Sequence, residues 1–529
     1  MNWLNIILIV YYVLVVIAIV HVVMDNRQPA KTMAWALVIY FVPVVGIVFY
    51  LFFGINHRRE RYVSERSMNQ LTKRSMLEFA EQQNLRLPDK HKPLIDLFVN
   101  QNLALPFKDN LVDICTDGYQ FISELMEDIG RAKEHIHIDM YIFAEDPLGT
   151  LVADALIDKS SQGVEVRLVY DDVGCWNVHH RFFERMREAG IEVRSFMPVR
   201  FPSFTSKVNY RNHRKIIVID GRVGYIGGMN IAQRYVQGSD GQSWRDTMLR
   251  ITGGGVHALQ RAFLVDWYFV DRTLLSDRKY YPRCEDISNN CLAQVVTSGP
   301  TTPYPEIQQG YVRIILGAKR YLYLETPYFL PNESVLFALK TAALGGVDVR
   351  VICPRRSDAR FVEWASRSYL REIQEAGVKV YLYEAGFLHS KMLVCDDSIT
   401  TCGSTNLDFR SFENNFEANI FFFDEGLALR MKNIFLRDQE QAVSLEDAKE
   451  RMNNGFFVLL WECVTRMLSP LFYFLKIEKF TLPYVRCSTK RGSFEKSFSL
   501  PCSNTSIPPS FSMPRSKISP GIVGSSLSA

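Results

Sequence analysis

Asn212-His-Arg-Lys-Ile-Ile-Val-Ile-Asp220 and Leu388-His-Ser-Lys-Met-Leu-Val-Cys-Asp396 are two copies of one pattern, H-x-K-x4-D. Six residues after each copy the chain continues as Gly-Gly-Met-Asn (227–230) or as Gly-Ser-Thr-Asn (403–406), so the histidine and the asparagine are 17 positions apart in both. A single H-x-K means little in a chain with 10 histidines. Two copies with the same spacing indicate an internal duplication.

The duplication extends upstream of these motifs. Arg320-Tyr-Leu-Tyr-Leu-Glu-Thr-Pro-Tyr-Phe329 corresponds to the strand-like stretch 135–143, and Gly-Val-Asp-Val-Arg (346–350) corresponds to Gly-Val-Glu-Val-Arg (163–167). Short β-rich runs alternate with helical patterns from about residue 110 onward, as in α/β proteins. We therefore expect an α/β fold with two lobes related by a pseudo-twofold axis, each lobe a mixed sheet flanked by helices.

Composition divides the rest of the chain. From Tyr484 to the end there are 13 serines in 46 residues and one acid, Glu495, a composition that cannot build a core. The expected parts are a two-helix transmembrane hairpin (1–56), a charged linker or cap (57–110), the first lobe (111–290), the second lobe (291–452), an apolar segment that is either interfacial or packed on the lobes (453–478), and a Ser/Pro-rich disordered tail (479–529).

The hairpin prediction rests on two uncharged runs of 22 residues each, Trp3–Met24 and Thr32–Phe53. Each is long enough for a helix of about 33 Å, which spans a bilayer. The chain starts without Lys or Arg, unlike a signal peptide. Two basic residues lie between the runs and six lie at 58–74, which predicts a cytoplasmic N-terminus and cytoplasmic lobes. Ten cysteines without a C-x-x-C pair are also typical of a reducing compartment.

The two motifs indicate phosphodiester chemistry. His213 and Lys215 are two residues apart at the start of an apolar strand, so their side chains point to one face. If the lobes pair about the pseudo-twofold axis, two imidazoles and two ammonium groups share one pocket. There the lysines neutralise phosphoryl oxygens, one histidine attacks phosphorus and the other protonates the leaving oxygen, with no metal or other cofactor required. The motif positions form the candidate catalytic set: His213, Lys215, Asp220, His389, Lys391 and Asp396.

The acidic residues of this region have different expected roles. Asp220 and Asp396 lie five residues beyond their lysines, an odd step that faces away from them, so we assign them mainly structural roles. Asp246 and Glu417 are better placed to hold the imidazoles in one tautomer, as the carboxylate of a Ser-His-Asp triad does. The alternative is that these two are ordinary surface acids.

The motifs resemble those of the phospholipase D superfamily, and residues 1 to about 475 resemble a bacterial cardiolipin synthase. The matching segments are 43–46 (Pro-Val-Val-Gly), 212–215, 244–246 (Trp-Arg-Asp), 326–329 (Thr-Pro-Tyr-Phe) and 468–471 (Leu-Ser-Pro-Leu). The resemblance implies transfer of a phosphatidyl group from one phosphatidylglycerol to another, giving cardiolipin and glycerol. It also implies a phosphatidyl-histidine at His213 and acid and base roles for His389, although the two copies alone do not distinguish the histidines. The groups that would hold the phosphoryl oxygens are Lys215, Lys391, Asn230 and Asn406.

The expected partners are phosphatidylglycerol and anionic membrane lipids, at the bacterial inner (cell) membrane. Residues 181–250 carry 13 basic and 6 acidic residues, which is either a rim facing the bilayer or a solvated surface. The net charge of +4 argues against a chain that coats nucleic acid, and no obligate protein partner is expected. The alternatives are a membrane-anchored phospholipase D-type hydrolase or nuclease, another phosphatidyltransferase, and an inactive membrane scaffold. Intact His and Lys in both motifs argue against the scaffold.

Overall fold

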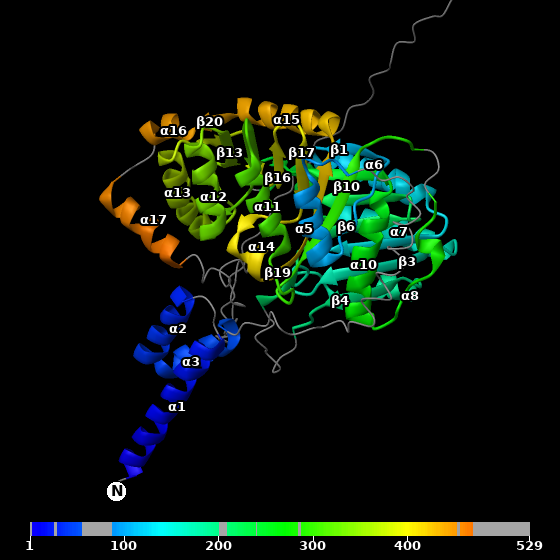
Figure 1. Cartoon of the computed structure of the whole chain (residues 1–529). Coiled ribbons are helices and arrows are strands. Elements are labelled where there is room, and N and C mark those ends of the chain that lie inside the picture. Colours follow the sequence, from blue (N-terminus) through cyan, green and yellow to red (C-terminus); the bar gives the residue numbers. More distant parts are fainter. Residues whose placement is uncertain are drawn as a thin grey trace, which may run out of the picture. The chain divides into compact units, whose positions relative to one another are not determined.

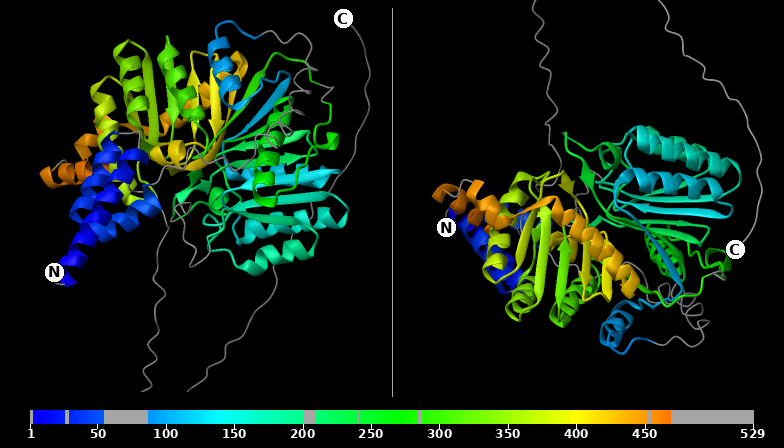
Figure 2. Two further views of the ribbon diagram at one scale, coloured as in Figure 1. Left: turned by 60° about the horizontal axis from the view of Figure 1, so that its bottom comes forward. Right: turned by 90° about the horizontal axis from the view of Figure 1, so that it is seen from above.

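The computed structural model describes residues 3–25, 29–54, 87–199, 209–239, 241–283, 287–451 and 455–468 (Figure 1). Most of the predicted linker and all of the predicted disordered tail (479–529) lie outside these residues. Within them the main body contains two mixed sheets with helices, as the repeat predicted (Figure 2).

The first sheet has seven strands in the order β1-β9-β7-β6-β2-β3-β4. Strands β2, β3 and β4 are parallel and the others pair antiparallel. Parallel neighbours need a crossover, and helices α7 and α8 supply it. The strands are β1 (Asn110–Cys115), β2 (His135–Met140), β3 (Glu165–Asp171), β4 (Glu192–Phe196), β6 (Lys215–Ile219), β7 (Val223–Gly227) and β9 (Met248–Gly253), and the helices are α6 (Gly118–Arg131), α7 (Pro147–Ser161), α8 (His180–Glu188), α9 (Arg234–Gln237) and α10 (Gly255–Asp271).

The second sheet repeats this order as β10-β19-β17-β16-β11-β13-β14, and β20 adds to its edge. The strands are β10 (Leu292–Ser298), β11 (Tyr321–Glu325), β13 (Asp348–Pro354), β14 (Lys379–Tyr383), β16 (Met392–Cys395), β17 (Ile399–Gly403), β19 (Asn415–Phe423) and β20 (Ala442–Ser444). The helices are α11 (Glu306–Gly317), α12 (Glu333–Leu344), α13 (Arg360–Glu375), α14 (Phe409–Glu413), α15 (Glu425–Glu440), α16 (Leu445–Arg451) and α17 (Phe456–Leu468), with a small parallel pair formed by β12 (Phe329–Leu330) and β18 (Leu407–Asp408).

Each strand of the first sheet therefore has a counterpart at the same position in the second, which confirms the duplicated α/β lobe. One buried apolar cluster joins the lobes, because Ile216 and Ile226 of the first sheet pack with Val394 and Phe422 of the second. This shared core fixes the two H-x-K motifs relative to each other, since β6 and β16 both contribute to it.

The segment before the first lobe is partly built into the second. Within the predicted linker, α5 (Lys92–Asn102) packs on α11 and β10, and Phe98 lies in the core of the second lobe against Phe421. The described part of this segment is therefore a cap on the second lobe.

The N-terminal helices differ from the two predicted spans. α1 (Trp3–Asp25) covers the first, but the second is divided into α2 (Pro29–Phe41) and α3 (Pro43–Phe53). The division falls at Pro43, which has no amide hydrogen and whose ring clashes with the preceding turn. In the part of the chain that the structure describes, no helix combines the length and the apolarity needed to cross a membrane.

Candidate active site

The two H-x-K motifs adopt the same local structure. His213 follows the short strand β5 (Arg211–Asn212) and Lys215 begins β6, while His389 follows β15 (Phe387–Leu388) and Lys391 precedes β16. All four side chains are buried. Each lysine turns back onto its own motif, because the Lys215 ammonium donates to the His213 carbonyl at 2.7 Å and Lys391 donates to the His389 carbonyl.

Each histidine is held at its backbone by the other lobe. β5 pairs in parallel with β19 of the second lobe, and the His213 amide donates to the Phe416 carbonyl at 2.9 Å. At the second motif, β15 pairs in parallel with β8 (Trp244–Arg245) of the first lobe, and the His389 amide donates to the Arg245 carbonyl at 2.7 Å. Each half-site, which is the histidine and lysine of one motif with the groups around them, is thus built across the lobe interface.

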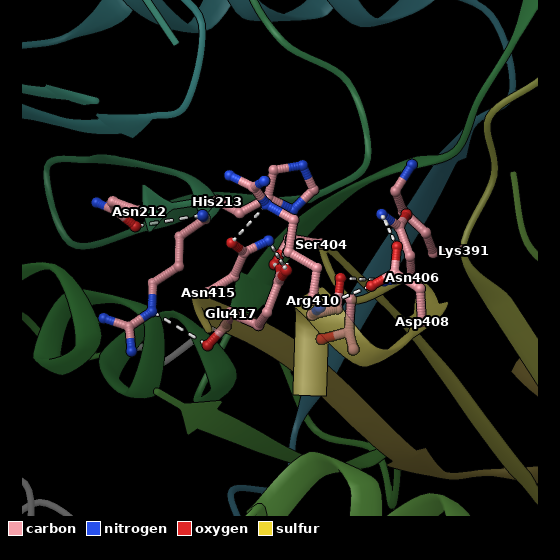
Figure 3. Close-up of polar contacts among 12 residues, drawn as sticks. Asn212, His213, Lys391, Ser404, Asn406, Asp408, Arg410, Asn415 and Glu417 are labelled. Carbon is pink, nitrogen blue, oxygen red and sulfur yellow. Dashed lines mark hydrogen bonds and ion pairs between the residues drawn. The ribbon is translucent and has the colours of Figure 1, made fainter. Parts of the chain in front are cut away.

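The two predicted carboxylates lie against the imidazoles, also across the interface. Nδ1 of His213 is 3.0 and 3.1 Å from the two carboxylate oxygens of Glu417. Figure 3 shows both residues among their polar neighbours. Nδ1 of His389 is 2.6 Å from Oδ2 of Asp246. Both acids are almost completely buried, so they are not surface acids. Holding Nδ1 leaves Nε2 of each ring as the nitrogen available for chemistry.

Burial and nearby charges shift the pKa values of three groups in the two half-sites. Burial lowers the pKa of His213 to about 3, so this imidazole is neutral at rest although Glu417 opposes the shift. Burial alone would raise the pKa of Glu417, but His213, the hydrogen bonds and Lys215 outweigh it and the pKa is lowered. Burial raises the pKa of Asp246 to about 6, against the attraction of Lys391.

The two lysines also contact side chains of the half-sites. Lys391 Nζ is 2.8 Å from Nδ1 of His389 and 3.9 Å from Oδ2 of Asp246. Lys215 lies over the ring of Tyr141, 5.0 Å from its centroid, and its charge acts on His213 and Glu417. The second half-site therefore holds an ammonium group directly beside its histidine and carboxylate.

The final residue of each motif lies at the other end of its strand. The Asp220 carboxylate accepts the backbone N–H groups of residues 133, 134 and 135 at 2.8–2.9 Å, where β2 begins. Asp396 does the same for residues 319, 320 and 321 at the start of β11. The structure does not bring these two aspartates to the imidazoles, and their hydrogen bonds fit a structural role.

The two motif asparagines make local contacts. Asn230 accepts the Ile142 amide at 3.0 Å and donates to the Tyr235 hydroxyl at 2.6 Å, and the Tyr235 ring lies 6.0 Å from that of His389. Asn406 donates to Asp408 at 3.3 Å, and its buried side-chain oxygen has no hydrogen-bond partner among the described residues. Asn230 thus positions an aromatic neighbour of His389.

Aromatic rings form the walls of both half-sites, which the sequence reading missed. Tyr141 lies 4.8 Å from His213, ring to ring. Among the described residues, the rings of Tyr235, Trp244, Tyr328 and Phe387 lie within 6.3 Å of the His389 ring. Trp244 and Tyr328 belong to the quoted Trp-Arg-Asp and Thr-Pro-Tyr-Phe segments, so those segments were the available signal.

A buried acid pair with one arginine lies next to each motif and was also missed. In the first lobe Arg214 pairs with Asp266, next to Asp139, which accepts from Asn212 at 2.6 Å. Beside the second motif, Arg245 of the first lobe pairs with Asp438 of the second lobe at 2.6 Å and lies 4.0 Å from Glu325. Burial raises the pKa of Asp139 well above its usual value and that of Glu325 to about 8. The sequence signal for these pairs was one carboxylate within each of two corresponding apolar strands, Asp139 in β2 and Glu325 in β11.

Within the described residues, no three or more His, Cys, Asp or Glu side chains are arranged to hold a metal ion. The site therefore consists of two histidines, two lysines and two carboxylates, with aromatic walls and two buried arginines. A neutral imidazole with a fixed tautomer can attack phosphorus, and a second imidazole can move a proton.

Comparisons with known proteins agree with this arrangement. A family model described as "Cardiolipin synthase, PLD-like domain" matches residues 125–267 and 311–439, and a phospholipase D-nuclease N-terminal model matches 13–54. The major cardiolipin synthase of Bacillus subtilis is 37% identical over 480 residues, covering 88% of this chain and 99% of the relative. The cardiolipin synthase of Oceanobacillus iheyensis is 37% identical, covering 86% and 97%.

Among solved structures, a phosphatidylserine synthase from Haemophilus influenzae has the same fold, with a TM-score of 0.57 and 15% identity over 72% of this chain and 98% of that one. The duplicated lobes, the paired motifs and the near full-length similarity lead to one assignment. The chain belongs to the cardiolipin synthase family of phospholipase D-like proteins.

Proposed function

We propose that this protein is a cardiolipin synthase that transfers a phosphatidyl group from one phosphatidylglycerol to another. The observation that carries the proposal is the pair of buried imidazoles, each fixed at Nδ1 by a carboxylate from the other lobe, 3.0 Å away for His213 and 2.6 Å for His389. Such a pair provides one nucleophile and one acid–base group, which a two-step transfer needs.

In the first step, Nε2 of His213 attacks the phosphorus of phosphatidylglycerol and forms a phosphorus–nitrogen bond. The bond from phosphorus to the glycerol headgroup oxygen breaks, and His389 gives that oxygen a proton, so glycerol leaves. His213 is the nucleophile in this proposal because its ring is neutral and its partner Glu417 is ionised. The charge that develops on His213 is balanced by that carboxylate.

In the second step, His389 takes the proton from a headgroup hydroxyl of a second phosphatidylglycerol, and the oxygen attacks the phosphatidyl-histidine. The phosphorus–nitrogen bond breaks, cardiolipin leaves, and His213 returns to its neutral form. Asp246, with a pKa raised to about 6, suits a partner that supports His389 in both protonation states. Lys215 and Lys391 supply positive charge to the phosphoryl oxygens, with Asn230 and Asn406 as supporting residues.

The membrane placement is part of the proposal. The helices α1, α2 and α3, which carry the two uncharged runs, anchor the chain in the bacterial cell membrane, and the basic residues at 58–74 keep the lobes in the cytoplasm. The apolar side chains that α1 exposes, such as Trp3 and Met24, support a lipid surrounding. Both substrates are then supplied by the bilayer.

The test is to incubate the purified protein with labelled phosphatidylglycerol in mixed micelles and to separate the products. Cardiolipin and glycerol in equal amounts support the transfer. Phosphatidic acid without cardiolipin would show that the protein is a hydrolase and would contradict the transfer. Folded protein without product would point to the scaffold alternative. His213→Ala and His389→Ala should each abolish turnover, and His213→Ala should also abolish the labelled covalent intermediate in a quenched reaction.

A further inference from the structure

The surface of the second lobe carries a helix whose polarity is inverted. α17 packs on α13 (Figure 1), and its charged residues Glu462 and Arg466 pair with residues of α13. Glu462 is 1% exposed and pairs with Arg371 of α13 at 2.6 Å. Arg466 pairs with Glu372 and lies 4.1 Å from the Tyr369 ring centroid. Ion pairs and a cation–π contact therefore hold α17 in place.

The outer side of the same helix is apolar. Phe456 is 73% exposed, Phe457 81% and Met467 74%, and Leu460 and Trp461 are also exposed. A surface helix of a soluble protein normally shows water its charged face and buries its apolar face. An apolar surface of this kind marks an interaction site. Here it lies on the outer side of the helix, so its partner lies outside the protein.

Aromatic and basic residues continue this surface onto the start of α13. Trp461 lies 6.4 Å from Phe361 and 5.9 Å from Trp364, ring to ring, and Phe361 is exposed. Arg356 and Arg360, just before Phe361, are exposed as well. Tryptophan and phenylalanine beside arginine are typical of a segment that lies at the interface of an anionic bilayer.

The loop before α13 also leads to the active site. Asp358 lies between the two exposed arginines and accepts from the Tyr328 hydroxyl at 2.8 Å. The Tyr328 ring in turn lies 6.3 Å from the ring of His389. The basic end of this surface is thus two contacts from the acid–base histidine.

We propose that the outer face of α17, with the start of α13, docks onto the surface of a bilayer that contains anionic phospholipid, and so brings the His389 side of the site to the membrane. The inverted polarity requires an apolar partner, and the flanking arginines select an anionic one. This inference rests on the proposed function only in that the bilayer supplies the phosphatidylglycerol substrate. The docking itself can be measured without turnover.

The test uses a fluorophore on Cys463, which is exposed on α17, while the other described cysteines are buried. In the full chain, Cys284, Cys487 and Cys502 are replaced by Ser, and the labelled protein is reconstituted in vesicles of phosphatidylcholine and phosphatidylglycerol with brominated acyl chains. The label should be quenched at least about threefold more than one placed at the exposed Tyr119 of α6 by Tyr119→Cys, because an interfacial helix lies at the boundary of the acyl chains.

A matched pair of variants distinguishes the apolar contact from added charge. Phe456→Glu with Phe457→Glu should reduce the quenching at Cys463 about twofold or more, since both rings are exposed and would lose the lipid. Tyr119→Glu with Leu151→Glu adds the same charge at exposed positions of α6 and α7 and should leave the quenching unchanged.

Equal quenching at Cys463 and at residue 119 would overturn the proposal. So would an unquenched label together with efficient Cys463–Cys463 crosslinking on vesicles, which would make the face a contact between two copies. A failure of the proposed function looks different, because the label would be quenched while no cardiolipin is formed.

Discussion

Replacing Glu417 by glutamine tests the cross-lobe carboxylate most directly. Three groups point donors at this carboxylate: Nδ1 of His213 at 3.0 Å, the Asn415 amide at 3.1 Å and the Ser404 hydroxyl. The glutamine oxygen can keep the first two, and its NH2 group can face Ser404, whose hydroxyl then accepts. Glu417→Gln therefore removes the negative charge but preserves the tautomer of His213.

The size of the effect follows from the distance. With the charge centres about 4 Å apart and an effective dielectric constant of about 20, a carboxylate stabilises an imidazolium-like group by about 4 kcal/mol. His213 becomes positively charged only when it attacks phosphorus, so this stabilisation acts on the transition state and the covalent intermediate. We expect kcat to fall about a thousandfold with little change in KM.

The assay is the initial rate of cardiolipin formation from labelled phosphatidylglycerol, with quenched samples to measure the covalent intermediate. Ser404→Ala is the matched control, because it removes one hydrogen bond from Glu417 and leaves its charge, and we expect about a tenfold loss or less. If Glu417→Gln keeps its thermal unfolding temperature and kcat stays within about tenfold of the parent, the proposed role of the carboxylate is refuted.

Three further predictions concern the same framework. Asp220→Ala removes the acceptor of three backbone N–H groups and should lower the free energy of unfolding in urea by about 3 kcal/mol, with activity per folded molecule retained; lost activity at full stability would contradict this. Asp246 has a pKa of about 6, so it takes up a proton as the pH falls through that value and then no longer balances a positive charge on His389. We therefore expect kcat to fall on the acid side with a midpoint near pH 6. An unchanged acid side of the pH profile in Asp246→Asn would disprove the assignment. Arg214→Met leaves the buried acids Asp139 and Asp266 without their cation and should lower the free energy of unfolding by about 3–5 kcal/mol in the same urea assay. Adding Asp266→Asn should recover part of this loss. If it recovers none, the pairing of Arg214 with Asp266 is ruled out.

The repeat made much of the fold predictable. Equal spacing from His213 to Asn230 and from His389 to Asn406 indicated two copies of one lobe, and the strand order of the two sheets is the same over seven positions. The odd step from Lys215 to Asp220 also indicated that this aspartate faces away from the lysine, and its carboxylate accepts backbone N–H groups where β2 begins. The spacing of the repeat and the period of a strand can both be read directly from the sequence.

The contacts across the lobes could not be predicted in the same way. Glu417 is 204 residues from His213 and Asp246 is 143 from His389, and no sequence pattern states which acid meets which ring. The orientation of α17 was hidden for a similar reason. Glu462 interrupts an apolar run, and only the position of Arg371 on another helix explains why the glutamate is buried.

The exchange of carboxylates has a consequence for the reaction as a whole. Each lobe contributes a histidine and a lysine to its own half-site but the carboxylate to the other, and the backbone of each histidine is also held by the opposite lobe. Neither half-site is complete unless the lobes are docked, so their shared apolar core is part of the active site. A shift between the lobes would move an imidazole away from its carboxylate in both half-sites at once. In the proposed mechanism, the nucleophile and the acid–base group would therefore be lost together.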